Sequence, residues 1–142
     1  MEITRETDYA IRCVLYLSER PDDVVMVEEI AKAKSIPKSF LSKILQKLVK
    51  ADIVKSYRGV KGGFQIAKDP MKINLLNVIE AIEGSVAMNR CAVNKNKCSL
   101  SCKCTVHPIW TNLRKDMERR LKKISFVNFI MYQEDGEKFK IK

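Results

Sequence analysis

Residues 53–67 contain the feature that most restricts the fold of this chain: two short β-prone runs on either side of a basic, glycine-rich turn. The runs are 53–57 and 64–67, and the turn between them reads Arg-Gly-Val-Lys-Gly-Gly. Glycine permits the tight backbone that such a turn needs. The sequence therefore predicts a β-hairpin with a basic tip.

The other periodic segments of the chain are helical. Apolar residues recur at helical spacing over 7–19, 27–33 and 38–50 before the hairpin, and Asn74 is placed to cap a fourth helix that Gly84 ends. Pro37 fits the first turn of the third helix. This order predicts a mainly α fold with a small β-hairpin wing, a winged helix-turn-helix.

A long helix is expected over 107–124, after the winged helix-turn-helix. Its apolar stripe is wider than an exposed helix needs, and its other face is basic. Such a stripe favours a partner helix and hence a homodimer. The residues of the stripe are Ile109, Leu113, Met117, Leu121 and Ile124.

Positive charge is concentrated in the third helix and the hairpin. The 142-residue chain has a formal net charge of +10, and residues 38–68 alone carry eight basic residues and one acidic residue. Residues 1–37 carry a net charge of −3. A basic block of this kind is typical of a protein that binds a polyanion.

The basic block predicts contacts to double-stranded DNA. A helix fits the major groove, and a glycine-rich tip can approach the duplex closely. We expect contacts from Ser39, Phe40 and Lys43 on the third helix, and from Arg58, Gly59 and Lys61 on the wing. The competing interpretation is that Phe40 packs in the core and that the lysines only face solvent.

Four of the five cysteines fall within 14 residues, in a segment over 85–106 that has no period. Cys91, Cys98, Cys102 and Cys104 precede His107, the only histidine. This pattern predicts a metal-binding or redox-active loop: an iron–sulfur site, a structural zinc site or a thiol switch. Cys13 lies in an apolar helical stretch and is expected to be a buried, inert thiol.

The sequence resembles the Rrf-two type family of bacterial winged-helix regulators over nearly its whole length. The resemblance rests on Thr-Asp-Tyr-Ala-Ile-Arg (7–12), on Ile-Pro-Lys-Ser-Phe-Leu-Ser-Lys-Ile-Leu-Gln-Lys-Leu (36–48) and on the wing Arg-Gly-Val-Lys-Gly-Gly-Phe (58–64). Three cysteines then precede a helix that contains Trp110. The resemblance implies a homodimer that binds a palindromic operator and senses redox state, nitric oxide or iron–sulfur status.

The resemblance also implies an iron–sulfur cluster on Cys91, Cys98 and Cys104, with Cys102 as an additional candidate ligand. In IscR-like members a histidine completes a 2Fe-2S site, and His107 stands at that position. In NsrR-like members an aspartate of the first helix, donated by the partner subunit, completes a 4Fe-4S site, and Asp8 matches it. The Thr-Asp-Tyr-Ala motif favours Asp8 and a 4Fe-4S cluster.

These interpretations divide the chain into four parts: a winged helix-turn-helix over 1–84, a cluster-binding loop over 85–106, two helices over 107–132 with the dimerisation helix first, and a flexible tail over 133–142. No segment is apolar and long enough for a membrane span, and no secretory signal precedes the first helix, so we expect a cytoplasmic protein. No nucleophile–base pair, phosphate loop or dinucleotide motif points to an enzyme.

Overall fold

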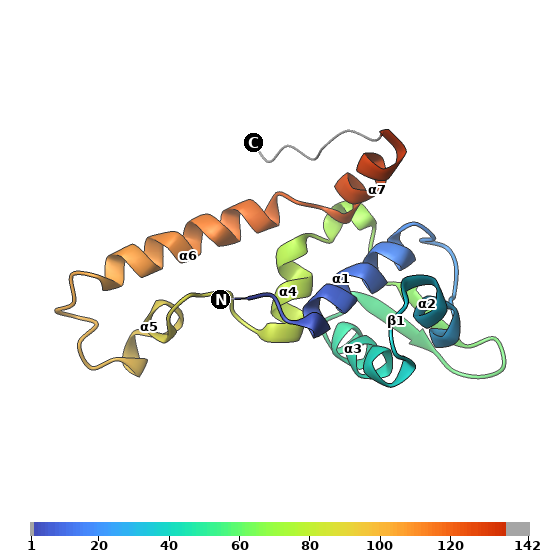
Figure 1. Cartoon of the computed structure of the whole chain (residues 1–142), viewed down its shortest axis with the longest axis horizontal. Helices are drawn as coiled ribbons and strands as arrows, with labels where there is room; N and C mark the ends of the chain where they lie inside the picture. Colours follow the sequence, from blue (N-terminus) through green and yellow to red (C-terminus); the bar gives the residue numbers. More distant parts are fainter. Residues whose placement is uncertain (1, 136–142) are drawn as a thin grey trace.

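Seven α-helices and one β-hairpin make up residues 2–135, the part of the chain that the computed structural model describes (Figure 1). The helices are α1 (Arg5–Ser18), α2 (Val27–Lys34), α3 (Lys38–Lys50), α4 (Leu75–Glu83), α5 (Arg90–Val93), α6 (His107–Lys122) and α7 (Phe126–Asp135). The hairpin consists of β1 (Val54–Tyr57) and β2 (Gly63–Ile66), and two short 3-10 helices are η1 (Pro70–Lys72) and η2 (Lys95–Lys97). The predicted mainly α winged-helix fold is confirmed.

The turn between α2 and α3 forms the helix-turn-helix. Ser35 ends α2 in the left-handed conformation, with φ 53° and ψ 46°, and the backbone N–H of Ile36 donates to the carbonyl of Ala31 at 2.9 Å. Pro37 is the N-cap of α3 rather than a residue of its first turn. Because a proline N-cap needs no N–H, it starts α3 directly after the turn.

The wing is fixed at its base by a third segment of chain. β1 and β2 pair antiparallel, from Val54 opposite Ile66 to Tyr57 opposite Gly63. Val25, just before α2, exchanges two backbone hydrogen bonds of 2.8 Å with Phe64. A side chain at position 63 would collide with the Val25 carbonyl, so this close approach requires glycine.

One hydrophobic core joins α1, α3, α4, the base of the wing and α7. Leu41, Ile44, Leu45 and Leu48 of α3 are fully buried in it. Phe126 of α7 is also fully buried there, and its N–H donates to the carbonyl of Ile73 at 3.0 Å. The chain therefore returns to the winged-helix core after α6. We call residues 2–83 together with α7 the winged-helix unit.

Residues 85–122, which include α5, η2 and α6, project from the winged-helix unit as an extension (Figure 1). We call this extension the arm. Only the inner end of α6 packs on α4, where Met117 and Leu121 contact a small cluster formed by Leu76, Ile79 and Val86. The outer half of α6 is joined to α5 by Arg114, whose guanidinium donates to the carbonyl of Ala92 at 2.7 Å.

The C-terminal helix α7 ends at Asp135. Residues 133–135 of the predicted tail are thus helical, and 136–142 lie outside the described residues. Within residues 2–135, no helix has both the length and the apolar character needed to cross a membrane.

Candidate functional site

The outer face of α3 is open to solvent and carries the side chains predicted to contact DNA. Ser39, Phe40 and Lys43 are exposed, because the opposite face of the helix supplies all of its core leucines. A shallow groove of about 410 Å³ runs over this face, and Glu6 of α1 and Lys47 line it together with these three residues. Phe40 is 49% exposed, so it is not part of the core.

Two residues of α1 hold the exposed side chains of α3 in place. The rings of Tyr9 and Phe40 meet edge to face, with centroids 6.2 Å apart and planes at 82°. The Glu6 carboxylate lies 2.7 Å from the Lys47 ammonium. These contacts were missed from the sequence, and the acidic first turn of α1 was the available signal for them.

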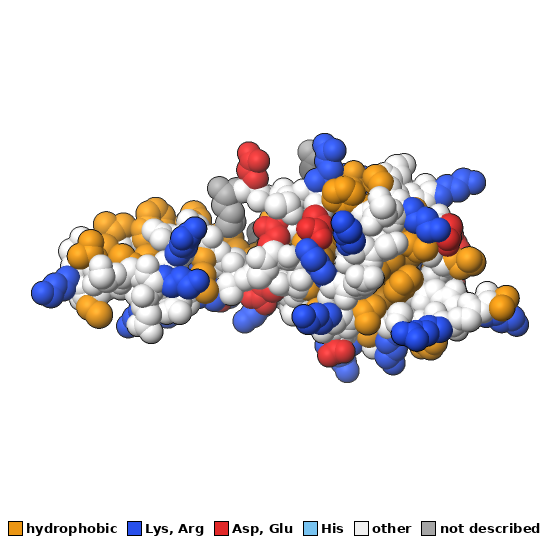
Figure 2. Space-filling view, turned by 90° about the horizontal axis from the view of Figure 1, so that it is seen from below, with side chains coloured by type: hydrophobic (Ala, Val, Ile, Leu, Met, Phe, Trp, Pro, Cys, Tyr) orange, Lys and Arg blue, Asp and Glu red, His pale blue; other side chains and the backbone are white. Residues whose placement is uncertain are grey.

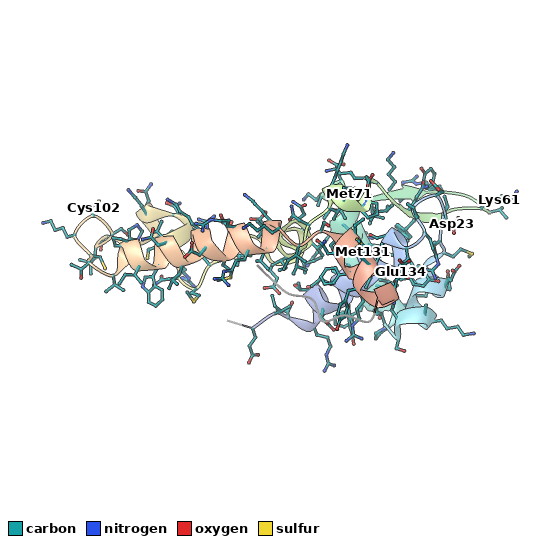
Figure 3. The ribbon with its side chains drawn as sticks, turned by 90° about the horizontal axis from the view of Figure 1, so that it is seen from above. Asp23, Lys61, Met71, Cys102, Met131 and Glu134 are labelled. Atoms are coloured by element: carbon teal, nitrogen blue, oxygen red, sulfur yellow. The ribbon has the colours of Figure 1, made fainter. Side chains whose placement is uncertain are left out.

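The wing tip presents Arg58, Gly59 and Lys61 to solvent. Gly59 has φ +102°, a conformation that a side chain would strain, and its carbonyl accepts from the Gly62 N–H at 2.9 Å. Val60 at the tip is completely exposed. Lys61 lies at one end of the molecule and Cys102 of the arm at the other (Figure 3).

Positive side chains lie on both regions of the molecule. Figure 2 shows Lys and Arg over the arm and over the winged-helix unit, with most of the visible acidic side chains between them. Residues 85–123 carry ten basic residues and two acidic ones. Both acids are engaged in ion pairs within α6, Glu118 with Arg114 and Asp116 with Arg119.

The cysteines of the arm differ in burial. Cys91 in α5 is buried, Cys98 and Cys104 are half-buried, and Cys102 is exposed. All of them are free thiols. Within residues 2–135, no three His, Cys, Asp or Glu side chains are gathered closely enough to hold a metal ion. Within this part of the chain, the predicted cysteine ligands are therefore not gathered into one coordination sphere.

The two candidates for a fourth ligand have different surroundings. His107 begins α6 and is buried, yet its Nδ1 atom has no hydrogen-bond partner among the described residues. The buried hydroxyl of Ser101 is unpartnered in the same way. Asp8 lies on α1, where its half-exposed carboxylate is 2.9 Å from the Arg12 guanidinium. A buried imidazole without a partner is unfavourable unless another group binds it.

Cys13 is separate from the other cysteines. It lies on the buried face of α1 and is completely inaccessible to solvent. Burial raises the pKa of its thiol to about 12. Because the thiolate is the form that reacts and binds metals, Cys13 has the properties of an inert core residue.

Comparison with known proteins places these features in one family. The profile of the Rrf2 family, described as iron-dependent transcriptional regulators, matches residues 3–131. The transcriptional regulator NsrR of Bacillus subtilis is 34% identical over 106 residues, which cover 73% of either chain.

Two solved structures have the same fold at lower identity. IscR of T. potens superimposes with a TM-score of 0.73 at 21% identity, over 99% of this chain and 93% of its own. CymR, the global cysteine regulator of B. subtilis, gives a TM-score of 0.73 at 19% identity, over 93% of this chain and 98% of its own. With a family profile that spans nearly the whole chain, and with an exposed basic helix and wing, this protein is a member of the Rrf2 family of DNA-binding transcriptional regulators and is not an enzyme.

Proposed function

We propose that this protein is a homodimeric regulator that binds a palindromic operator and senses redox state, nitric oxide or iron–sulfur status through an iron–sulfur cluster on the arm. DNA recognition is assigned to α3 and the wing. The metal site is assigned to Cys91, Cys98 and Cys104. The observation that carries the sensor proposal is the buried Nδ1 atom of His107, which has no partner in the described part of the chain and follows a segment of free thiols.

The proposed DNA contacts use side chains that have no role in the core. Ser39, Phe40 and Lys43 face the major groove in this arrangement, and the wing residues Arg58 and Lys61 reach phosphates or the adjacent minor groove. Gly59 lets the backbone of the tip approach the duplex. The support is exposure: all of these residues are accessible to solvent in the free protein.

Replacing the wing arginine tests this assignment. We expect Arg58→Ala to weaken specific binding by about 1–3 kcal/mol if the side chain reads a base or a narrow groove. The measurement is a titration of an operator selected by the wild-type protein from random-sequence DNA. Unchanged affinity in an Arg58→Ala, Lys61→Ala double variant would contradict the wing assignment.

The proposed dimer uses the apolar face of α6. Ile109 is 54% exposed and Leu113 is 41% exposed, whereas the same stripe is half-buried at Met117 and Leu121 against α4. A second α6 related by a two-fold axis would cover the exposed half of the stripe. Light scattering at micromolar concentration tests this, and a monomeric mass with and without metal would contradict it.

The donor set fits an iron–sulfur cluster by its chemistry. Cys91, Cys98 and Cys104 are free thiols in one segment, and thiolates are the ligands that such clusters require. When bound, the cluster supplies an iron centre that reacts with oxygen or nitric oxide. The thiols must move together to bind it, because the described residues contain no preformed group of three ligands. Loading would thus order the loop between α4 and α6.

The fourth ligand is proposed to be either Asp8 of the partner subunit or His107. An oxygen or imidazole ligand is displaced more easily than a thiolate, which suits a sensor. The Thr-Asp-Tyr-Ala motif of α1 favours Asp8 and a 4Fe-4S cluster, whereas the unpartnered Nδ1 atom supports His107.

Single variants separate these ligand assignments in protein purified without oxygen. If Asp8→Ala loses a 4Fe-4S absorption and Mössbauer spectrum while His107→Ala keeps it, aspartate is the ligand. The reverse result with a 2Fe-2S spectrum supports histidine. If Cys91→Ala, Cys98→Ala and Cys104→Ala all retain iron and sulfide, the cysteine assignment is wrong and Cys102 becomes the next candidate. A colourless protein that contains zinc would contradict the iron–sulfur proposal.

A further inference from the structure

Glu83 joins the end of α4 to the beginning of α1, 76 to 79 residues earlier in the chain. Its Oε1 atom accepts hydrogen bonds from the N–H of Thr4 at 2.9 Å, from the hydroxyl of Thr4 at 2.9 Å and from the hydroxyl of Thr7 at 2.5 Å. Thr4 is the N-cap of α1, and Thr7 is fully buried. A carboxylate at a helix N-terminus is also favoured by the helix dipole.

The first two turns of α1 also contact the outer face of α3. Glu6 pairs with Lys47 at 2.7 Å, and Tyr9 contacts the ring of Phe40. Residues 4 and 7 of this segment therefore contact Glu83, and residues 6 and 9 contact the helix that carries the proposed DNA contacts.

Glu83 also stands at the root of the arm. Gly84 ends α4 with φ 81° and ψ −157°, a conformation that permits an abrupt change of direction into the arm. Ile3, just before the N-cap of α1, lines a groove of about 330 Å³ together with Met117 and Leu121 of α6. The segment before α1 thus faces the inner end of α6 across an apolar groove, and the hydrogen bonds of Glu83 hold the start of α1 beside the residue at which the arm begins.

We propose that Glu83 is a positioning residue for DNA binding: it fixes the first two turns of α1, and these turns fix Phe40 and Lys47 on α3. This proposal rests on the DNA contacts proposed above for α3. The contacts of Glu83 thereby connect the residue at which the arm begins to the DNA-reading helix. A change in the conformation of the arm at Gly84 then alters the positions of the exposed side chains of α3.

The remainder of α1 explains why the coupling is confined to its beginning. Ala10, Val14 and Leu17 anchor the rest of the helix in the core with no exposed surface. The first turn, by contrast, is held by the hydrogen bonds of Thr4 and Thr7 to Glu83. Loss of the Glu83 carboxylate therefore loosens the first turn of α1 without removing core packing, and the contacts of Glu6 and Tyr9 to α3 weaken with it.

Glu83→Gln in the full-length, metal-free protein tests the proposal, with Glu80→Gln as the matched control. Glu80 lies one turn earlier on α4, is exposed, and makes no side-chain hydrogen bond among the described residues. Both changes remove one negative charge, which by itself strengthens DNA binding. We expect Glu83→Gln to weaken binding to the selected operator by about threefold to tenfold, against this electrostatic trend, and Glu80→Gln to leave it equal or tighter.

The NMR chemical shifts of the backbone amides distinguish a positioning role from a simple loss of stability. In folded Glu83→Gln we expect shifts at Phe40 and Lys47, as well as at residues 4–9. If the variant does not fold, Thr7→Val removes the donor at constant shape and Thr7→Ser retains it, and only Thr7→Val should reproduce the weaker binding.

Lys43→Ala, measured in parallel, separates this proposal from the assignment of the DNA interface. If Lys43→Ala weakens binding and both Glu83→Gln and Thr7→Val bind as the wild type does, the interface stands and the positioning role is wrong. Shifts confined to residues 4–9 also overturn the positioning role. If Lys43→Ala itself binds normally, the α3 interface is wrong, and the role of Glu83 fails with it.

Discussion

The winged-helix unit buries the three leucines of α3 completely, whereas the arm leaves leucines exposed to solvent. Leu41, Leu45 and Leu48 of α3 have no exposed surface, but Leu113 of α6 is 41% exposed and Leu100 is 66% exposed. In the unit, backbone N–H and carbonyl groups at turns and helix ends form hydrogen bonds with other parts of the backbone. In the arm, the buried Ser101 hydroxyl and the Nδ1 atom of His107 have no hydrogen-bond partner within residues 2–135.

The two regions therefore differ in how fully a single chain buries their apolar side chains and pairs their buried polar groups. The winged-helix unit has a core large enough to hold its fold, so its exposed residues are free to bind DNA. The arm exposes part of an apolar stripe and carries free thiols, and the proposed dimer and the proposed metal site rest on these features.

The cysteines of the two regions should differ most strongly in reactivity. Burial raises the pKa of Cys13 from 9.0 to about 12, which lowers its thiolate fraction at pH 8 by about a thousandfold. In metal-free protein we expect iodoacetamide to modify exposed Cys102 at least about a hundredfold faster than Cys13, as followed by peptide mass spectrometry. Unfolding in guanidinium should abolish the difference. Comparable rates in the folded protein would mean that the core opens readily.

Leucine truncation should have unequal effects on stability. Leu48→Ala creates a cavity in the core and should lower the free energy of unfolding by about 2–5 kcal/mol at any protein concentration. Leu113→Ala should cost less than about 1 kcal/mol in the monomer and more at concentrations where α6 is paired. Denaturant titrations at two concentrations measure both. An equally large, concentration-independent loss for Leu113→Ala would show that the arm has a core of its own.

Basic residues at the two ends of the molecule should differ in their effect on DNA binding. Lys61 at the wing tip and Lys103 beside Cys102 are both exposed, and Figure 3 places Lys61 and Cys102 at opposite ends. We expect Lys61→Ala to flatten the slope of log K against log salt by about one unit and Lys103→Ala to leave it unchanged. A reduced slope for Lys103→Ala would assign phosphate contacts to the arm as well.

The smallest effect concerns the junction of the two regions. Hydrogen bonds from Thr7 and Thr4 lower the pKa of Glu83 below its ordinary value of 4.5. Its contribution to stability is thus present above about pH 4.5 and is lost as the pH falls through the folded-state pKa. We expect acid unfolding to be less steep below pH 4.5 in Glu83→Gln than in the wild type and in Glu80→Gln. Identical acid-unfolding curves for all three proteins would contradict this contribution of Glu83 to stability.

Much of the winged-helix unit could be predicted from residue patterns. The third helix was expected over 38–50 and found there, and the Asn74 cap and the Gly84 stop of α4 were both correct. These features depend on local periodicity and capping, which neighbouring residues determine. Phe40 was ambiguous, because its position beside Leu41 did not reveal which side of the helix would face the core.

Other features depended on contacts between distant segments. The pairing of Val25 with Phe64, the burial of Phe126 in the winged-helix core and the contacts of Glu83 to α1 have no local signature. The sequence grouped α6 and α7 together as C-terminal helices, and only the folded chain separated a projecting α6 from a returning α7. The short helix α5 was also missed, since four residues are too few for a detectable period.

The longer helices, the wing and the types of candidate ligand can be predicted from the residues alone, because spacing and side-chain chemistry are properties of the chain. The sequence also places four thiols and the only histidine within 17 residues. Which of these groups are buried became clear only from the folded chain. The same is true of the contacts by which Glu83, Glu6 and Tyr9 connect the root of the arm to α3 through α1. Burial and long-range contacts follow from how complete helices pack against one another, and packing involves residues that are far apart along the chain.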